Sequence, residues 1–294
     1  MNFPDYPFTS HYTDIQGHKL HYLDEGPRNA EPVVMLHGNP SWSYYYRKLV
    51  LALRGNYRCI VPDHIGMGFS DKPAGGDYDF LFTRRADDLA ALLETLDINK
   101  NITLVLHDWG GMIGMTYALY YPERIKRLII FNTAAFQLQS GKTLPMALTL
   151  SRIPVINALL IQGLNAFCGG AVRYGVTRRP MPADIAAAYL APYDNWQNRL
   201  AVRKFVEDIP MQRGVAGYAT VMAVADGLSR FRSLPMLICW GMKDFVFDES
   251  FLNEWTQRFP SAELHRFADA GHYVLEDAAE EIIPLVKDFL RRNR

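Results

Sequence analysis

The segment ITLVLHDWGGMIGMTYALY, residues 102–120, joins an apolar β-rich run, a tight turn and an apolar helical stretch in direct succession. This layout is typical of a nucleophile elbow, in which a sharp strand-to-helix turn holds one side chain exposed. Asp108 occupies that place, where a serine is usual. A carboxylate needs no base to become nucleophilic, and it can attack a saturated carbon to give an alkyl-enzyme ester. The segment therefore predicts covalent catalysis by Asp108.

The composition narrows the class of protein. A chain of 294 residues can bury the core of one large α/β domain with an inserted subdomain. Lys plus Arg equals Asp plus Glu, 31 each, so no nucleic-acid partner is expected. The three cysteines lie far apart, which argues against a disulfide framework or a zinc site, and we expect no metal and no cofactor. The first residues lack a basic and an apolar region, so a cytoplasmic protein without a signal peptide is expected.

Short apolar runs alternate with helical segments along most of the chain. We expect strands at 32–36, 57–61, 102–106, 128–131, 236–240 and 264–267, and helices at 42–53, 82–96, 111–121 and 280–291. This alternation favours βα units and a mainly parallel sheet with helices on both faces. Residues 134–214 lack it and read as several helices joined by turns that contain Pro and Gly. We predict a core of residues 1–133 and 215–294, with residues 134–214 inserted as a helical cap.

One stretch of the predicted cap carries no charge. Residues 153–172 contain no Asp, Glu, Lys or Arg, but Pro154, Gly163 and Gly169 interrupt them. A membrane-spanning helix needs a more uniformly apolar run, so no transmembrane span is expected. We expect buried helices beside an apolar cavity, and a peripheral membrane or partner contact stays open.

Four loops follow predicted strands and carry polar side chains. They supply Asn39, Asp108 with Trp109, Asp244, and His272. Ligands in open α/β sheets bind beyond the carboxyl ends of the strands, so we expect these residues to meet there. The chain order of nucleophile, acid and histidine is that of an α/β-hydrolase fold.

The chemistry suggests a role for each residue. His272 would act as general base on a water that hydrolyses the ester formed on Asp108. Asp244 would orient the His272 ring and stabilise its imidazolium form. The backbone N–H of Trp109 is the expected oxyanion donor, with the N–H of Asn39 as the second.

Two side chains are suited to hold a departing halide. The indole N–H of Trp109 and the amide N–H₂ of Asn39 are neutral donors. Aimed neutral donors in a dry cavity stabilise a diffuse anion, whereas a carboxylate or phosphate substrate would favour an arginine. Asp108 as a mere helix cap, and Asp248 in place of Asp244, stay open as alternatives. His37 and His107 are expected to orient loops by hydrogen bonding.

With these residues in view, the chain resembles the haloalkane dehalogenases of the α/β-hydrolase superfamily over essentially its full length. The matching motifs are HGNP at 37–40, PDHIGMGFS at 62–70, HDWGG at 107–111, GMKD at 241–244 and GH at 271–272. One branch of that family has a Glu after the strand before the lid, where this chain reads Asn132-Thr133-Ala134. Another has an acid in place of Asn39. The chain is similar to the third branch, which implies a triad of Asp108, His272 and Asp244, with Asn39 and Trp109 on the halide.

That branch also resembles the β-lactone decarboxylases of long-chain olefin biosynthesis, which share these five positions. Epoxide hydrolases are similar at 107–111 and 120–124 and use lid tyrosines, but they commonly have an aromatic residue in place of Asn39. A receptor or scaffold also stays open, because a fold does not fix a function. The resemblance implies a cofactor-free dehalogenase that acts on a small apolar halogenated or long-alkyl substrate and releases a halide and a primary alcohol. A β-lactone decarboxylase is the first alternative, and a homo-oligomer is possible.

Overall fold

Apolar runs pair into one eight-stranded sheet, with the strand order β1-β2-β4-β3-β5-β6-β7-β8. The computed structural model describes residues 3–137, 149, 153, 155–210 and 213–294. The strands are β1 (His11–Ile15), β2 (His18–Glu25), β3 (Pro32–Leu36), β4 (Arg58–Pro62), β5 (Ile102–Asp108), β6 (Ile125–Thr133), β7 (Met236–Gly241) and β8 (Glu263–Phe267). β2 pairs antiparallel with β1 and β4, and the remaining pairs are parallel. The expected mainly parallel sheet is confirmed.

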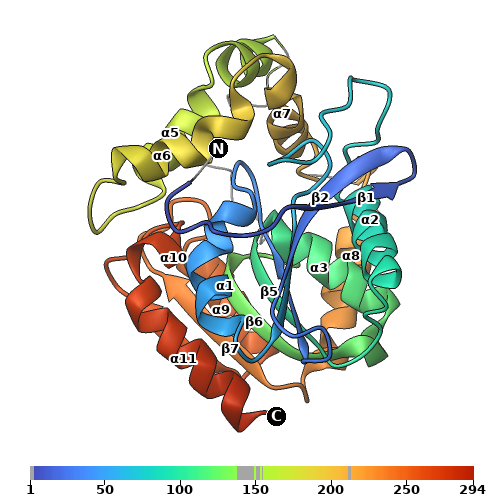
Figure 1. The fold of residues 1–294 in the computed structure, drawn as a ribbon, viewed down its shortest axis with the longest axis vertical. Helices are drawn as coiled ribbons and strands as arrows, with labels where there is room; N and C mark the ends of the chain where they lie inside the picture. Colours follow the sequence, from blue (N-terminus) through green and yellow to red (C-terminus); the bar gives the residue numbers. More distant parts are fainter. Residues whose placement is uncertain (1–2, 138–148, 150–152, 154, 211–212) are drawn as a thin grey trace.

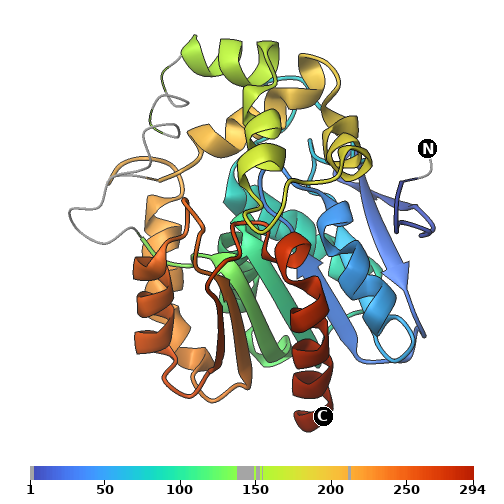
Figure 2. The ribbon, with the colours of Figure 1, turned by 90° about the vertical axis from the view of Figure 1, so that its left-hand side faces the viewer.

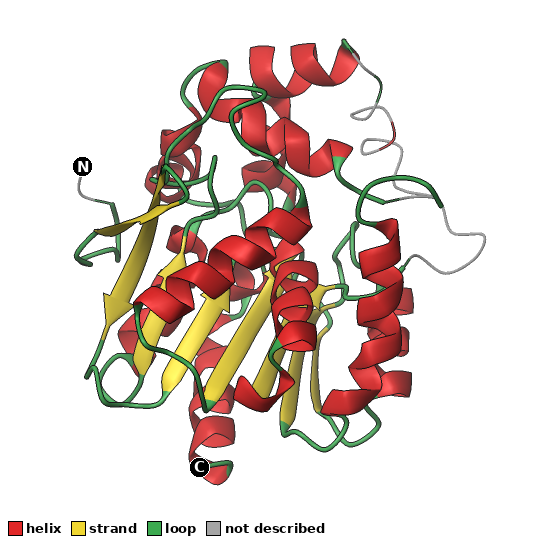
Figure 3. Cartoon of the chain, turned by 90° about the vertical axis from the view of Figure 1, so that its right-hand side faces the viewer, coloured by secondary structure: helices red, strands yellow, loops and turns green. Residues whose placement is uncertain are grey.

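Helices cover both faces of the sheet (Figure 3). α1 and α11 contact each other on one face, while α3 contacts both α2 and α8 on the other. The helices that surround the sheet are α1 (Arg47–Leu53), α2 (Phe82–Thr95), α3 (Trp109–Tyr120), α8 (Tyr218–Gly227), α9 (Glu249–Arg258), α10 (Val274–Asp277) and α11 (Ala279–Arg292). Because helices shield both faces, every residue of the central strand β5 is buried, which explains its continuous apolar run.

A second group of helices lies beyond the carboxyl ends of the strands, at the top of Figures 1 and 2. They are the π-helix η3 (Ala158–Gly163), α5 (Ala166–Tyr174), α6 (Ala183–Leu190), the short turns η4 (Ala191–Tyr193) and η5 (Gln197–Arg199), and α7 (Leu200–Glu207). We call the predicted segment 134–214 the cap. Its exact boundaries stay a prediction, and residues 138–148, 150–152, 154 and 211–212 lie outside the described residues.

The uncharged stretch 153–172 differs from the expectation of buried helices. Ile161 and Cys168 are buried, but Val155 is 80% exposed, Leu159 58% and Leu164 67%. Each short helix has an inward and an outward face, so a lack of charge does not by itself imply burial. No helix in the described part of the chain is long and apolar enough to cross a membrane.

The elbow at the end of β5 is a tight approach of two strands and a helix. Asp108 has φ +50° and ψ −127°, and α3 begins at the next residue. A Cβ at Gly110 would overlap the carbonyl oxygen of Leu36 in β3. The glycine therefore lets α3 start close enough to the sheet to hold Asp108 at its edge.

Gly110→Ala is expected to lower the free energy of unfolding by about 2–3 kcal/mol, because the backbone of Leu36 cannot yield as a side chain can. Urea unfolding followed by circular dichroism measures the change. Gly55→Ala is the matched control, since a Cβ there would meet no atom within 4 Å. Equal stability of the two variants would mean that the elbow tolerates a wider separation.

Candidate active site

The five residues predicted from the sequence lie at one edge of the sheet. Asn39 follows β3, Asp108 ends β5 and Trp109 begins α3. Asp244 follows β7, and His272 follows β8. The parallel register of the strands explains why these residues lie close together. Leu36 pairs with Leu106 and Gly241 with Phe267, so the loops that follow these strands begin at the same edge of the sheet.

His272 lies between the two carboxylates. Its Nδ1 is 2.8 Å from Oδ2 of Asp244, and its Nε2 is 3.8 Å from Oδ2 of Asp108. All three side chains are buried. With Nδ1–H donating to Asp244, the other ring nitrogen is directed at Asp108, which is the geometry of a nucleophile, a base and an orienting acid.

The loop after β7 shows which of two carboxylates, Asp244 or Asp248, contacts His272. Oδ1 of Asp244 accepts the backbone N–H groups of Val246 at 2.7 Å and Phe247 at 3.1 Å, which leaves Oδ2 to His272. Asp248 instead caps α9 by accepting the N–H of Ser250 at 2.9 Å. The structure therefore brings Asp244, and not Asp248, to the histidine.

Burial and charge act in opposite directions on this pair. Burial raises the pKa of Asp108, and the nearby His272 together with the N–H groups of Trp109 and Asn39 offsets only part of that rise. Burial lowers the pKa of His272, but Asp244 and then Asp108 more than compensate, so this pKa lies above its ordinary value. His272 thus keeps its proton to a higher pH than a free histidine does.

Two backbone donors hold the carboxylate of Asp108. The N–H of Asn39 donates to Oδ1 at 2.6 Å, and the N–H of Trp109 also bonds to the carboxylate. These are the two donors expected for an oxyanion. Oδ1 is the oxygen that accepts from Asn39, and Oδ2 lies 3.8 Å from Nε2 of His272.

The side chains expected to hold the leaving group lie under the cap. Nδ2 of Asn39 donates one hydrogen to the carbonyl of Val202 in α7 at 3.0 Å, and its second hydrogen meets no acceptor in the described part of the chain. The Trp109 ring lies near Phe82 and Phe205, with ring centroids 6.1 and 5.4 Å away. Their contact with a leaving group stays a prediction.

The histidines expected to orient loops make the corresponding bonds. Nδ1 of His37 donates to the carbonyl of Gly38 at 2.8 Å, and its Nε2 accepts the N–H of His64 at 3.2 Å. Nε2 of His107 donates to the carbonyl of His272 at 2.9 Å. The loops of Asn39 and His272 are therefore fixed by buried imidazoles.

Sequence reasoning missed Glu276, which lies in α10 shortly after His272 and bonds to the cap. This buried carboxylate binds Arg47 through both oxygens and Lys48 at 3.3 Å, and it accepts the hydroxyl of Tyr189 in α6 at 2.6 Å. The ring of Tyr189 stacks on Tyr273, with centroids 5.2 Å apart. Because 229 residues separate Arg47 from Glu276, no local pattern signals the pair.

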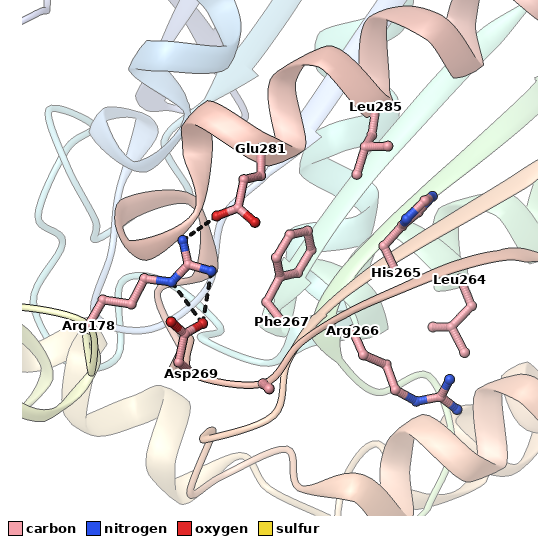
Figure 4. Close-up of a pocket in the computed structure, with 9 residues that line it drawn as sticks. Arg178, Leu264, His265, Arg266, Phe267, Asp269, Glu281 and Leu285 are labelled. Atoms are coloured by element: carbon pink, nitrogen blue, oxygen red, sulfur yellow. Dashed lines mark hydrogen bonds and ion pairs between the residues drawn. The ribbon is translucent and has the colours of Figure 1, made fainter.

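A hollow of about 550 Å³ opens elsewhere, beside β8 and α11 (Figure 4). Arg178 of the cap lines it at one side and forms ion pairs with Asp269, at 2.8 Å, and with Glu281. None of the five predicted site residues lines this pocket. It is a place where the cap is fastened to the core.

The sheet, the elbow and the aligned aspartate and histidine define a protein of the α/β-hydrolase class. The model of the alpha/beta hydrolase fold family matches residues 31–279, and the chain belongs to that family. The chain is 52% identical to the cis-3-alkyl-4-alkyloxetan-2-one decarboxylase of Shewanella oneidensis, over 97% of this chain and 89% of that protein. It is 32% identical to a haloalkane dehalogenase of Mycobacterium marinum, over 96% and 94%.

A solved structure agrees with the fold. The haloalkane dehalogenase DatA of Agrobacterium tumefaciens superposes with a TM-score of 0.84 at 24% identity, over 97% of each chain. The predicted α/β-hydrolase fold and the resemblance to both enzyme groups are thereby confirmed.

Proposed function

We propose that the protein is a β-lactone decarboxylase, which converts a cis-3,4-dialkyl oxetan-2-one into an alkene and CO₂. The observation that carries this proposal is the identity of 52% with the decarboxylase, against 32% with the dehalogenase, each over more than nine-tenths of this chain. The alternative that the sequence left open is therefore preferred to the dehalogenase reaction.

The first step would open the lactone ring. Oδ2 of Asp108 attacks ring carbon 4, the bond from that carbon to the ring oxygen breaks, and an ester to Asp108 forms. The ring oxygen leaves as a carboxylate that stays attached through carbon 3. Asn39 and Trp109 would donate to this anion in the place otherwise taken by a halide.

The second step would regenerate the free carboxylate of Asp108 without the use of water. The bond between carbon 3 and the carboxylate breaks, its electron pair forms the alkene, and the ester bond to Asp108 breaks as CO₂ leaves. Inversion at carbon 4 followed by anti elimination is equivalent to a syn loss of the two ring bonds. Substituents that are cis on the lactone ring therefore give a cis alkene. An imidazolium at His272, 3.8 Å from Oδ2, would stabilise the carboxylate of Asp108 as it is expelled.

Haloalkane dehalogenation is the second candidate. The observation in its favour is the 32% identity to a haloalkane dehalogenase. An alkyl halide would use the same nucleophile, Asp108, and the same two donors, Asn39 and Trp109. The ester formed would then need a water activated by His272 to release the alcohol. The two reactions thus share their first step and differ in their need for water.

A matched assay tests the proposal. Purified protein is given a cis-dialkyl β-lactone, 1-bromobutane or styrene oxide, and alkene, bromide or diol is measured against a blank without protein. We expect kcat/KM for alkene formation to exceed that for bromide release by about 100-fold. Faster bromide release would favour the dehalogenase, diol formation an epoxide hydrolase, and binding without turnover a receptor.

A further inference from the structure

The loop that carries His272 is bonded on both sides of the histidine, next to the cap. After the histidine, the backbone N–H of Tyr273 donates to the carbonyl of Gly175 in the cap at 2.7 Å. Before it, the backbone N–H of Gly271 donates to Oδ2 of Asp277 at 2.8 Å. A Cβ at Gly271 would lie 2.8 Å from the carbonyl oxygen of Gly175, so the loop and the cap are in direct contact.

The carboxylate of Asp277 joins the cap to the loop on the Gly271 side. Besides the N–H of Gly271, its Oδ2 accepts the N–H of Thr177 in the cap at 2.9 Å. Its Oδ1 accepts the N–H of Arg178 at 3.2 Å. Hydrogen bonds to a charged acceptor are stronger than those between neutral groups. One carboxylate therefore fixes three backbone N–H groups, one of the loop and two of the cap.

Asp277 reaches the residue before His272 because α10 is a single turn. The N–H of Asp277 donates to the carbonyl of Tyr273 at 3.2 Å, so the chain turns directly after the histidine and brings the carboxylate back to its other side. The ring depends on this backbone. Nδ1 of His272 lies 2.8 Å from Oδ2 of Asp244, and a small displacement of the loop would lengthen that bond.

We propose that Asp277 is a positioning residue for His272, whose carboxylate fixes the backbone before the histidine and joins it to the cap segment 175–178. The ring is thereby held in line between Asp244 and Asp108. The effect on the reaction rests on the proposed function, in which His272 acts in the second step. The support of the ring does not depend on any substrate.

The proton on Nδ1 of His272 reports on the position of the ring. The buried pair of His21 and Asp63 has the same distance of 2.8 Å as the pair of His272 and Asp244, and it provides an internal reference. Low-field proton NMR of the full chain should show both protons, and His272→Ala assigns the first by its loss. In Asp277→Ala we expect the His272 proton to exchange with water about tenfold faster, and the His21 proton to keep its wild-type rate.

A conservative variant and a matched control complete the test. In Asp277→Asn the amide oxygen can accept the two N–H groups that Oδ2 binds, while the NH₂ group opposes the N–H of Arg178, so an intermediate exchange rate is expected. Glu281→Gln is the control, because among the described residues the side chain of Glu281 bonds to Arg178 alone (Figure 4). It changes a contact of the same cap segment without touching the His272 loop, so both protons should exchange as in the wild type.

On the lactone, kcat of Asp277→Ala should fall by about tenfold at an unchanged KM, because the substrate does not contact Asp277. The melting temperature verifies that each variant is folded. If Asp277→Ala does not fold, Asp277→Asn must still exchange the His272 proton faster than Glu281→Gln does. The spectra contain no substrate, so this result and the decarboxylase assay can fail independently.

Three results would overturn the proposal. The His272 proton could exchange at the wild-type rate in both Asp277 variants, or be missing from the spectrum of the wild type. Glu281→Gln could speed its exchange as much as Asp277→Ala does, which would reduce Asp277 to a fastening of the cap. The His21 proton could change by the same factor, which would indicate a general loosening of the fold.

Discussion

Replacing Asp108 by asparagine is expected to lower the rate of alkene formation by about 10⁴-fold or more, because a neutral amide does not attack a saturated carbon. The amide keeps the shape of the side chain and an oxygen to accept the N–H of Asn39, now 2.6 Å away. Because asparagine has the same branching at Cβ as aspartate, it should adopt the φ of +50° and ψ of −127° at this position as aspartate does. The loss would therefore report on the chemistry and not on folding. Gas chromatography measures the alkene, and intact mass verifies that the amide has not hydrolysed.

Asp248→Asn is the control for this experiment. Asp248 caps α9, and asparagine caps a helix about as well, so both activity and stability should stay close to those of the wild type. An Asp108→Asn protein of verified mass that still forms alkene at the wild-type rate would exclude the elbow carboxylate as nucleophile.

The site could be located from the sequence because parallel strands impose a common edge. Once the apolar runs before Asn39, Asp108, Asp244 and His272 are read as strands of one parallel sheet, their following loops must meet. The elbow adds the position of Asp108, since a strand, a tight turn and a glycine-containing helix allow little other geometry. Distance along the chain is then no obstacle.

Contacts without a repeating pattern could not be predicted. Glu276 meets Arg47 and Tyr189 through tertiary packing alone, and the bond from Asn39 to the carbonyl of Val202 depends on where the cap rests. The outward face of residues 153–172 was missed because the absence of charge describes both buried and exposed apolar helices.

The leaving group is a separate case. The motifs describe a nucleophile, a histidine and two neutral donors, and halide displacement and lactone opening begin with all of these. Only the identity over the whole chain distinguishes the two groups of relatives. The two reactions differ in their second step. An experiment can therefore separate them at the residues that act in that step, above all His272.

His272→Ala is expected to affect lactone decarboxylation and dehalogenation differently. With 1-bromobutane the variant should release one equivalent of bromide and stop, because no base activates the water, and mass spectrometry should find the butyl ester on Asp108. With the lactone it should continue to form alkene, slowed by about 100-fold through loss of the imidazolium beside Oδ2. His265→Ala is the control, since His265 pairs with Glu263 on β8, away from the five site residues.

The pH dependence of the wild-type protein is a second, independent way to distinguish the two reactions. The pKa of His272 is raised, mainly because Asp244 and Asp108 outweigh burial, so the imidazolium persists below that pKa and is lost as pH rises through it. Alkene formation should then fall, and bromide turnover should rise, across that interval. Both should fall at low pH as Asp108, whose pKa burial raises, takes up a proton. His272→Ala should remove the alkaline decline in alkene formation; an ester trapped from the lactone would instead show that water, and not elimination, frees Asp108.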